Sequence, residues 1–252
     1  MTFIEAIILG VTQGLTEFLP ISSSGHLVIM QHLLKINSNG NEFEILVHLG
    51  TLGSILVVFF HDLQSLISGY KSKQNKLYIF HLLIASIPAA IAGIFFKDHF
   101  ETFFDNHYFV SKALMFTGLI LILSYLFKPK NKKINFSSSL LIGFFQALAI
   151  IPGISRSGMT ISFALLLGIN AKDAAKFSFL MAIPIVSGAG LLTFLGSYDD
   201  FSVPASQGFA ALISSFLVGI FALKWLINWL SKGKLHYFGF YCFIISIFTL
   251  IN

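Results

Sequence analysis

One basic side chain of this sequence stands apart from the others, in the stretch Pro152–Thr160. Arg156 is the only arginine of the chain, and long apolar runs flank the stretch on both sides. Burying a lone cation in an apolar medium is very unfavourable, so Arg156 must contact water or be held by partners. Its guanidinium group presents a planar fork of donors that matches phosphate and carboxylate oxygens. Arg156 is therefore predicted to bind an anion.

A second polar stretch interrupts the apolar N-terminal region over residues 13–26. It contains a carboxylate, Glu17, an imidazole, His26, and three consecutive serines at positions 22–24. Placed beside a bound anion, a carboxylate and an imidazole supply the proton shuttle and the base or nucleophile that hydrolysis requires. No GxxxxGK[ST] or HExxH pattern is present, so the chain has neither a Walker loop nor that type of zinc site.

The two polar stretches resemble each other at a spacing of 133 residues. Seven of sixteen aligned positions are identical, namely Gly10/Gly143, Gln13/Gln146, Leu15/Leu148, Ile21/Ile154, Ser22/Ser155, Ser24/Ser157 and Gly25/Gly158. The charged side chains do not repeat, since Arg156 aligns with Ser23 while Glu17 and His26 align with apolar residues. The stretches are thus predicted to form an internal repeat whose halves contribute different parts of one site.

Composition places this site in a membrane protein. Apolar residues make up 56% of the chain and charged residues only 11%, and the mean hydropathy is +0.83. A soluble domain carries about 25% charged residues. The net charge of +5 does not indicate a nucleic-acid partner, because the lysines lie in short loops between apolar runs, as orientation signals do. The single cysteine, Cys242, excludes a disulfide within one chain.

The apolar runs predict an all-α polytopic membrane protein with six transmembrane helices. These runs cover residues 43–60, 77–96, 113–127, 177–195, 209–230 and 237–251. Each polar stretch instead lies between apolar pieces that are too short to cross a bilayer, within residues 3–34 and 138–168. Irregular backbone at membrane depth is tolerated only inside protein or beside a watery cavity. Each polar stretch is therefore predicted to be the tip of a re-entrant helical hairpin.

Loop charges predict the orientation of the spans. The loops at 71–76, 128–133 and 232–234 are basic, whereas the loops at 98–105 and 199–200 are acidic. The positive-inside rule assigns the basic loops to the cytoplasm and, with six spans, places both termini outside. Three spans separate the hairpins, and an odd number reverses orientation. We therefore expect inverted-topology repeats, about 1–127 and 138–252, in a single membrane domain of residues 1–252, with the two tips meeting near the midplane.

The pooled tips predict one phosphate site. Arginine, hydroxyl groups and backbone N–H groups at helix starts are together typical of phosphate binding. The candidate catalytic residues are Glu17, Ser23, His26 and Arg156. The candidate substrate-binding residues are Gln13, Ser22, Ser24, Gln146, Gly153, Ser155, Ser157, Gly158 and Thr160. The nucleophile remains open between Ser23, His26 and an activated water.

The strings QGLTEFLPISSSGH (13–26) and PGISRSGMT (152–160) closely resemble the two signature motifs of the undecaprenyl-diphosphate phosphatase family, the bacitracin-resistance type. The resemblance extends along essentially the whole chain. It implies hydrolysis of undecaprenyl diphosphate to undecaprenyl phosphate and inorganic phosphate, which recycles the lipid carrier of peptidoglycan and other cell-wall polymers. It also implies a bacterial plasma-membrane protein whose site opens to the outer face.

The resemblance further implies stimulation by a divalent cation, Mg²⁺ or Ca²⁺, with Glu17 as the candidate metal ligand. Arg156 is then expected to clamp the diphosphate. The chain departs from some members of the family in having Gln13 where they have a glutamate. Glutamine cannot transfer protons and is a weaker metal ligand, so these roles are expected to fall to Glu17. Glu44 is a further carboxylate that approaches the site in one interpretation, whereas His48 is interpreted as a packing residue.

A different class of function remains to be weighed against hydrolysis. Inverted repeats with broken helices are typical of transporters, so a polyprenyl-phosphate transporter or flippase is the alternative. Transport needs the anion clamp but not the pair of Glu17 and His26, and the pair favours the enzyme. The expected partners are a polyprenyl diphosphate lipid and the surrounding membrane lipids, and the sequence leaves open whether a homodimer forms.

Overall fold

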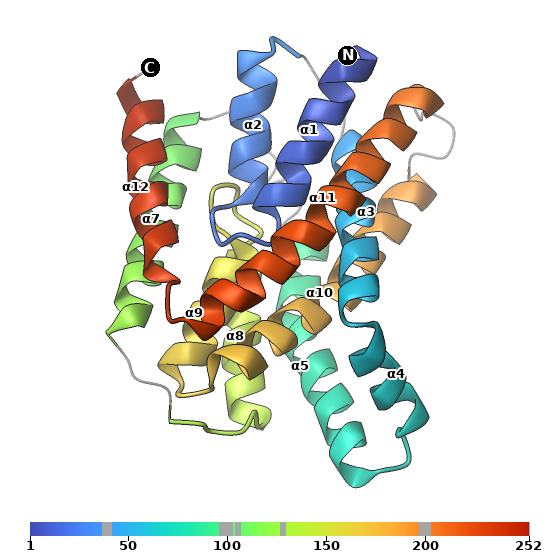
Figure 1. Ribbon diagram of the computed structural model, residues 1–252, viewed down its shortest axis with the longest axis vertical. Helices are drawn as coiled ribbons and strands as arrows, with labels where there is room; N and C mark the ends of the chain where they lie inside the picture. Colours follow the sequence, from blue (N-terminus) through green and yellow to red (C-terminus); the bar gives the residue numbers. More distant parts are fainter. Residues whose placement is uncertain (37–41, 96–102, 104–106, 127–129, 197–202, 252) are drawn as a thin grey trace.

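Figure 1 shows the computed structural model, which describes residues 1–36, 42–95, 103, 107–126, 130–196 and 203–251. Within these residues the secondary structure is helical throughout, without strands. The helices are α1 (Phe3–Thr16), α2 (Ser23–Leu33), α3 (Glu42–Val58), α4 (Phe60–Ser68), α5 (Lys73–Phe95), α7 (His107–Tyr125), α8 (Phe136–Leu148), α9 (Arg156–Leu166), α10 (Ala171–Gly196), α11 (Ala205–Ser231) and α12 (His236–Ile251). The all-helical prediction is confirmed for the described residues.

Both polar stretches connect two short helices. Residues 17–22 join α1 to α2, and residues 149–155 join α8 to α9. The helices α2 and α9 begin at Ser23 and Arg156, positions that align in the repeat, and each has 11 residues. Each also begins with the same cap. The Ser22 hydroxyl accepts a hydrogen bond from the Gly25 N–H at 3.3 Å, and the Ser155 hydroxyl accepts one from the Gly158 N–H at 3.1 Å.

The first helix of each half packs against a helix of the other half, and we call this crossed packing. The first-half helix α1 lies against α11, and the second-half helix α8 lies against α5, while α7 and α12 lie side by side (Figure 1). Glycines permit both crossed contacts. A Cβ at Gly10 would come within 2.6 Å of the Ala211 carbonyl oxygen, and one at Gly143 within 2.4 Å of the Ala85 carbonyl oxygen. Aligned residues therefore allow the same close backbone approach in both halves.

Several of these helices have the length of a membrane span. Among the described residues, α5, α11, Tyr108–Tyr125 of α7 and Ala171–Thr193 of α10 are long and apolar enough to cross a bilayer. The pair α3 and α4 also passes this test, but its two helices meet at a bend of 69°. The last predicted span corresponds to α12, an apolar helix of 16 residues. A multi-pass membrane protein is thus supported, with four to five candidate spans.

The predicted span over residues 43–60 differs from the structure at its C-terminal end. The helix α3 ends at Val58, and α4 leaves in a new direction from Phe60. The side chain of Asp62 on α4 pairs with Lys176 of α10, and Leu66 of α4 is buried. These contacts hold α4, which follows the predicted span, against the rest of the protein, and hydropathy alone does not reveal them.

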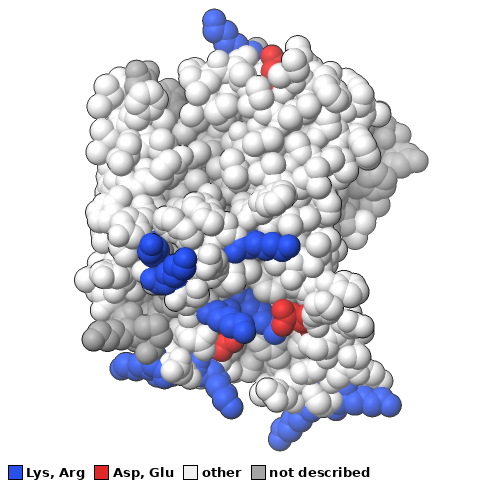
Figure 2. Space-filling model, in the orientation of Figure 1, with Lys and Arg blue, Asp and Glu red and all other residues white. Residues whose placement is uncertain are grey.

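Charged side chains concentrate at one end of the molecule. In Figure 2 most of the exposed lysines lie over its lower half, on the side of α4 and of the α7–α8 connection. Both termini lie at the opposite end in Figure 1. The predicted acidic loops, with Asp98, Glu101, Asp105, Asp199 and Asp200, fall outside the described residues.

Candidate active site

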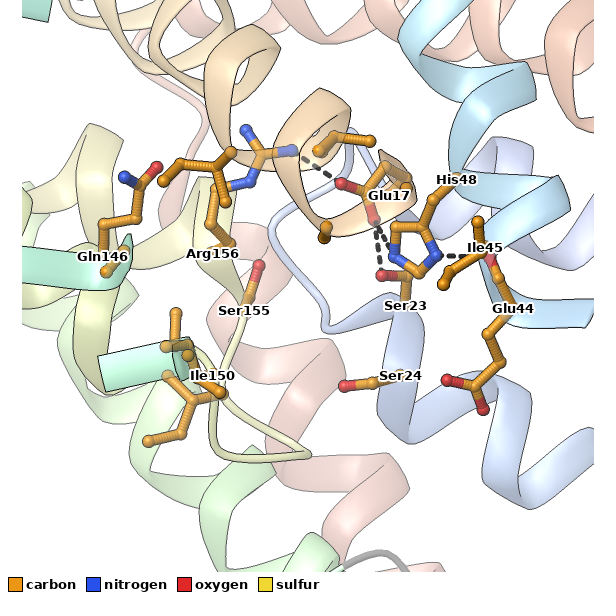
Figure 3. A pocket seen from close by; sticks show the side chains of 18 of the residues that line it. Glu17, Ser23, Ser24, Glu44, Ile45, His48, Gln146, Ile150, Ser155 and Arg156 are labelled. Carbon is orange, nitrogen blue, oxygen red and sulfur yellow. Dashed lines mark hydrogen bonds and ion pairs between the residues drawn. The ribbon is translucent and has the colours of Figure 1, made fainter. Parts of the chain in front are cut away.

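The two turns meet at a cavity of about 360 Å³. Figure 3 shows its polar residues in two groups, one from the first turn, α2 and α3, and the other from α8 and α9. The first group is Glu17, Ser23, Ser24, Glu44 and His48, and the second is Gln146, Ser155 and Arg156. Apolar side chains of α5, α10 and the second turn complete the wall, including Ala89, Ile150, Ile185, Val186 and Ala189. A cavity with both kinds of wall suits an amphiphile with an anionic head.

Glu17 is the centre of the polar network. Its Oε1 accepts a hydrogen bond from Arg156 Nη2 at 2.6 Å, and its Oε2 accepts one from Ser23 Oγ at 2.6 Å. Gln13 Nε2 donates to the same Oε2 at 3.1 Å. The Glu17 side chain is only 8% exposed. Glu17 therefore joins the arginine of the second polar stretch to the serine and glutamine of the first.

Packing holds the two charged groups in this position. Phe18, adjacent to Glu17, is fully buried and contacts Phe179 of α10 edge to face, with ring centroids 5.6 Å apart. Arg156 Nη1 lies 3.5 Å from the Ser178 carbonyl oxygen, also on α10. The Arg156 side chain remains 17% exposed, on the cavity wall. Its guanidinium group can thus balance Glu17 and still face a ligand.

The N-termini of two helices point their partial positive charge toward this site. Ser23 and Arg156 are the first residues of α2 and α9. A helix N-terminus favours anions because its first backbone N–H groups have no partner within the helix and the helix dipole is positive there. Ser22 and Ser155, predicted to bind substrate, serve here as the caps of these two helices. Ser155 also lines the cavity.

The other predicted binding residues of the second turn mostly contact protein. Thr160 is fully buried, and its hydroxyl lies 2.6 Å from that of Ser178. Ser157 is bonded weakly to the Leu19 carbonyl oxygen at 3.5 Å. Gly153 has a φ of +92°, and a Cβ there would lie 2.4 Å from the Val110 carbonyl oxygen. Gly153 therefore shapes the second turn, and the other three residues, Ser157, Gly158 and Thr160, pack the start of α9. Their predicted substrate contacts stay predictions.

The structure places His26 away from Glu17. Its Nδ1 lies 2.8 Å from the Ser22 carbonyl oxygen, and its Nε2 lies 2.8 Å from the Tyr241 hydroxyl of α12. The two rings are stacked, and His26 is not among the cavity-lining residues. His26 lies three positions after Ser23 on α2, and its ring reaches Tyr241 of α12. Its catalytic role stays a prediction that these contacts do not favour.

Two residues of α3, Glu44 and His48, line the cavity, although the sequence assigned Glu44 to the site in one interpretation only and His48 to packing. His48 Nε2 lies 3.6 Å from Glu17 Oε2, and His48 Nδ1 lies 2.6 Å from the Glu44 carbonyl oxygen. His48 was interpreted as a packing residue, yet its side chain is 28% exposed on the cavity wall. A sequence signal exists, because Glu44 and His48 are four residues apart and share a helix face. Their aligned positions in the second half, Phe177 and Met181, are apolar.

The side chains of the cavity wall decide whether a divalent cation can bind there. Among the described residues, no three His, Cys, Asp or Glu side chains are grouped to hold a metal ion. The cavity wall offers the carboxylates Glu17 and Glu44. Mg²⁺ keeps several waters and commonly binds through one or two carboxylates together with substrate phosphates. The residues fit that mode of binding, in which the ligand completes the site.

Comparison with known proteins gives the family. The sequence profile described as bacitracin resistance protein BacA matches residues 6–248, nearly the whole chain. The chain belongs to the BacA family. The resemblance drawn from the two polar stretches is thereby confirmed. The residues that form the Glu17 network are those of the two motifs that carried this resemblance.

Curated relatives match the BacA-family chain from end to end. It is 40% identical over 262 residues to an undecaprenyl-diphosphatase of Bacteroides thetaiotaomicron, covering 100% of this chain and 99% of the relative. It is 40% identical to the undecaprenyl-diphosphatase of Halothermothrix orenii, covering 100% and 98%. It is 38% identical to undecaprenyl-diphosphatase 1 of Bacillus cereus, covering 98% and 97%. Nothing in these alignments leaves a large part of either chain unmatched.

Proposed function

We propose that this protein is a membrane phosphatase that hydrolyses undecaprenyl diphosphate to undecaprenyl phosphate and inorganic phosphate. The observation that carries the proposal is the Glu17 carboxylate, which binds Arg156 through one oxygen and the Ser23 hydroxyl through the other, both at 2.6 Å. Arg156 and Ser23 are the first residues of α9 and α2, and a helix N-terminus favours a phosphate group. Membership of the BacA family and relatives named undecaprenyl-diphosphatases support the same substrate.

In the proposed reaction Ser23 is the nucleophile and Glu17 its base. Ser23 Oγ attacks the terminal phosphorus while its proton passes to Glu17 Oε2, and the anhydride bond breaks with its electron pair on undecaprenyl phosphate. Arg156 stabilises the charge that develops on the transferred group. Water then releases inorganic phosphate from Ser23, and Glu17 returns the proton. The short Ser23–Glu17 hydrogen bond favours this assignment over His26, which contacts Tyr241 instead.

The remaining parts of the cavity suit the remaining parts of the substrate. The apolar wall formed by α5, α10 and the second turn is proposed to hold the first isoprene units. Gln13, Ser22, Ser24, Ser155, Ser157 and Thr160, with the backbone at Gly153 and Gly158, are proposed to position the diphosphate. A divalent cation, Mg²⁺ or Ca²⁺, bound through Glu17 and phosphate oxygens would supply charge neutralisation. In the cell this reaction recycles the lipid carrier for the synthesis of peptidoglycan and other cell-wall polymers, and it confers resistance to bacitracin.

The arrangement in the bilayer is proposed to be that of inverted-topology repeats. Two observations support two equivalent halves, about 1–127 and 138–252, in one domain. The helices α2 and α9 begin at aligned positions with the same cap, and α1 and α8 each pack against a helix of the other half. Six spans and two re-entrant hairpins then place the lysine-rich end in the cytoplasm of the plasma membrane. Both termini and the mouth of the site lie on the outer face in this proposal.

The direct test is phosphate release from undecaprenyl diphosphate by the purified protein in detergent, where no membrane separates two compartments and transport cannot occur. Ser23→Ala and Ser24→Ala form a matched pair, because both hydroxyls line the cavity but only Ser23 bonds to Glu17. We expect Ser23→Ala to lose roughly a hundredfold or more in turnover and Ser24→Ala to lose much less. A wild-type protein that binds the lipid but releases no phosphate would favour the transporter.

A further inference from the structure

Gln146 has an unusual position in the cavity wall. Its side chain is buried, with the residue 2% exposed, and among the described residues its Oε1 has no hydrogen-bond partner. Its Nε2 faces the Ala85 carbonyl oxygen at 3.4 Å, and this contact identifies which end of the amide is the oxygen. In Figure 3 that oxygen lies on the side of Arg156. A buried acceptor is thus held at the phosphate site.

The partner of such an acceptor must be a hydrogen-bond donor. A buried carbonyl oxygen without a donor is destabilising, and native proteins seldom tolerate one unless a ligand or water completes it. The ionised diphosphate of the substrate presents only acceptor oxygens, which would repel the Gln146 oxygen. Water is the donor that the proposed reaction itself brings to this place.

The positions of Ser23 and Gln146 match the two ends of an in-line displacement. In phosphoryl transfer the attacking and leaving oxygens lie roughly in line through the phosphorus. Ser23 is the first residue of α2, whereas Gln146 belongs to α8; both line the cavity, and in the view of Figure 3 Arg156 lies between them. A phosphoryl group on Ser23 and held by Arg156 therefore presents its far side toward Gln146. The attacking water must approach from that side.

We propose that Gln146 positions the water that hydrolyses phosphorylated Ser23, an inference that rests on the proposed function. The Oε1 accepts a hydrogen bond from this water and takes no proton. The water oxygen forms the new bond to phosphorus, the Ser23 Oγ–P bond breaks, and its electron pair stays on Oγ. Oγ recovers its proton from Glu17, and both protons of the water leave on inorganic phosphate. Gln146 thus acts in the second half of the reaction only.

Rapid-quench kinetics with undecaprenyl diphosphate labelled in its terminal phosphate separates the two halves. In Gln146→Met, which keeps length but lacks the acceptor, we expect the first turnover to stay within about threefold of the wild type. Later turnovers should slow by roughly tenfold to a hundredfold, the range for a misplaced reactant. Acid-stable label should then accumulate on Ser23. Gln146→Glu restores an acceptor oxygen and should recover most of the steady rate without labelled protein.

Controls make each outcome decisive. Gln64→Met makes the same change at an exposed position on α4 and should match the wild type in both phases. Gln146→Leu replaces the methionine variant if that protein does not fold, as judged by thermal unfolding in detergent. Unchanged turnover in Gln146→Met, or in Gln146→Leu where it is used instead, would overturn the inference. Equal slowing of both phases without label on Ser23 would also overturn it. A wild-type protein without phosphate release would instead overturn the proposed function.

Discussion

At the scale of single residues, Glu17 combines a structural and a chemical role. One oxygen balances the charge of Arg156, while the other accepts the hydrogen bond of Ser23. Removing one partner of a buried ion pair typically destabilises a protein by about 3–5 kcal/mol, because the remaining charge is left without compensation. Substitutions that keep the shape or the charge therefore separate the two roles better than alanine does.

Arg156→Lys keeps the positive charge but removes the planar fork. The ammonium group can still pair with Glu17, yet it cannot hold Glu17 and a phosphoryl oxygen in the fixed geometry of a guanidinium. We expect kcat/KM for undecaprenyl diphosphate to fall by roughly two orders of magnitude or more, as when one preorganised electrostatic group is removed. Phosphate release in detergent measures this. Near-normal turnover would remove the clamp role from Arg156.

Glu17→Gln keeps the size of the side chain and removes its ability to take a proton. We expect the protein to fold and to lose roughly a hundredfold or more in turnover, within the range for loss of a general base. The control is Glu5→Gln on α1, the helix that Glu17 follows, where Glu5 completes the capping box with Thr2. Phosphate release and thermal unfolding of both variants measure the effect. An active Glu17→Gln protein would reduce Glu17 to charge balance.

The site could be predicted from sequence only where residue type and local spacing determine it. Arg156 had to contact water or be held by partners, and the repeat predicted that its turn meets the one with Glu17 and Ser23, which the structure places within hydrogen-bond distance of one another. The contact of His26 depends on where α12 places Tyr241, and no local signal encodes it. His48 reaches Glu17 only because α3 packs beside the first turn, so its interpretation as a packing residue missed the cavity wall.

At the scale of the helices, glycines decide how closely the two halves approach. Gly143 of α8 lies against the backbone of α5, where a Cβ would lie 2.4 Å from the Ala85 carbonyl oxygen. Backbone cannot move aside as the end of a flexible side chain can, so helix α8 would have to shift. Gln146, one turn further along α8, contacts the same carbonyl oxygen. The fit of this helix pair therefore positions part of the cavity wall.

Gly143→Ala tests this close approach. Alanine favours a helix over glycine by about 1 kcal/mol, but overpacking typically destabilises by about 1–3 kcal/mol. We expect a lower thermal unfolding temperature in detergent and slower phosphate release. Gly188→Ala on α10 is the matched control, since nothing lies within 4 Å of a Cβ there. It should be as stable as the wild type or more stable. Equal effects of the two variants would contradict the role of the contact.

The helical architecture could be predicted largely because apolar runs and caps are local. The apolar runs at residues 77–96, 177–195 and 209–230 fall on α5, α10 and α11. The two short-helix pairs correspond to the interrupted stretches, whose serines cap α2 and α9. The bend between α3 and α4 was not predicted, because it depends on the pairing of Asp62 with Lys176 from a distant helix.

At the scale of the whole molecule, charge and helix direction give one consistent orientation. The lysines gather at the end opposite both termini, where the α4–α5 and α7–α8 connections lie (Figures 1 and 2). Lysine-rich loops are retained in the cytoplasm during membrane insertion. The proposed orientation therefore predicts opposite exposure for two exposed residues, Lys133, before α8, and Ser206, at the start of α11.

Single cysteines test this orientation. Cys242 is buried and is first replaced by alanine, after which Lys133→Cys or Ser206→Cys supplies one accessible thiol. A membrane-impermeant maleimide applied to intact spheroplasts should label Ser206→Cys, whereas Lys133→Cys should react only after lysis. Both variants should retain phosphate release, because neither residue lines the cavity. Labelling of Lys133→Cys in intact spheroplasts would reverse the orientation, and labelling of both would contradict it. The expected pattern would place the N-terminal end of α8 on the cytoplasmic side of the bilayer and the N-terminal end of α11 on the outer side, as the distribution of the lysines requires.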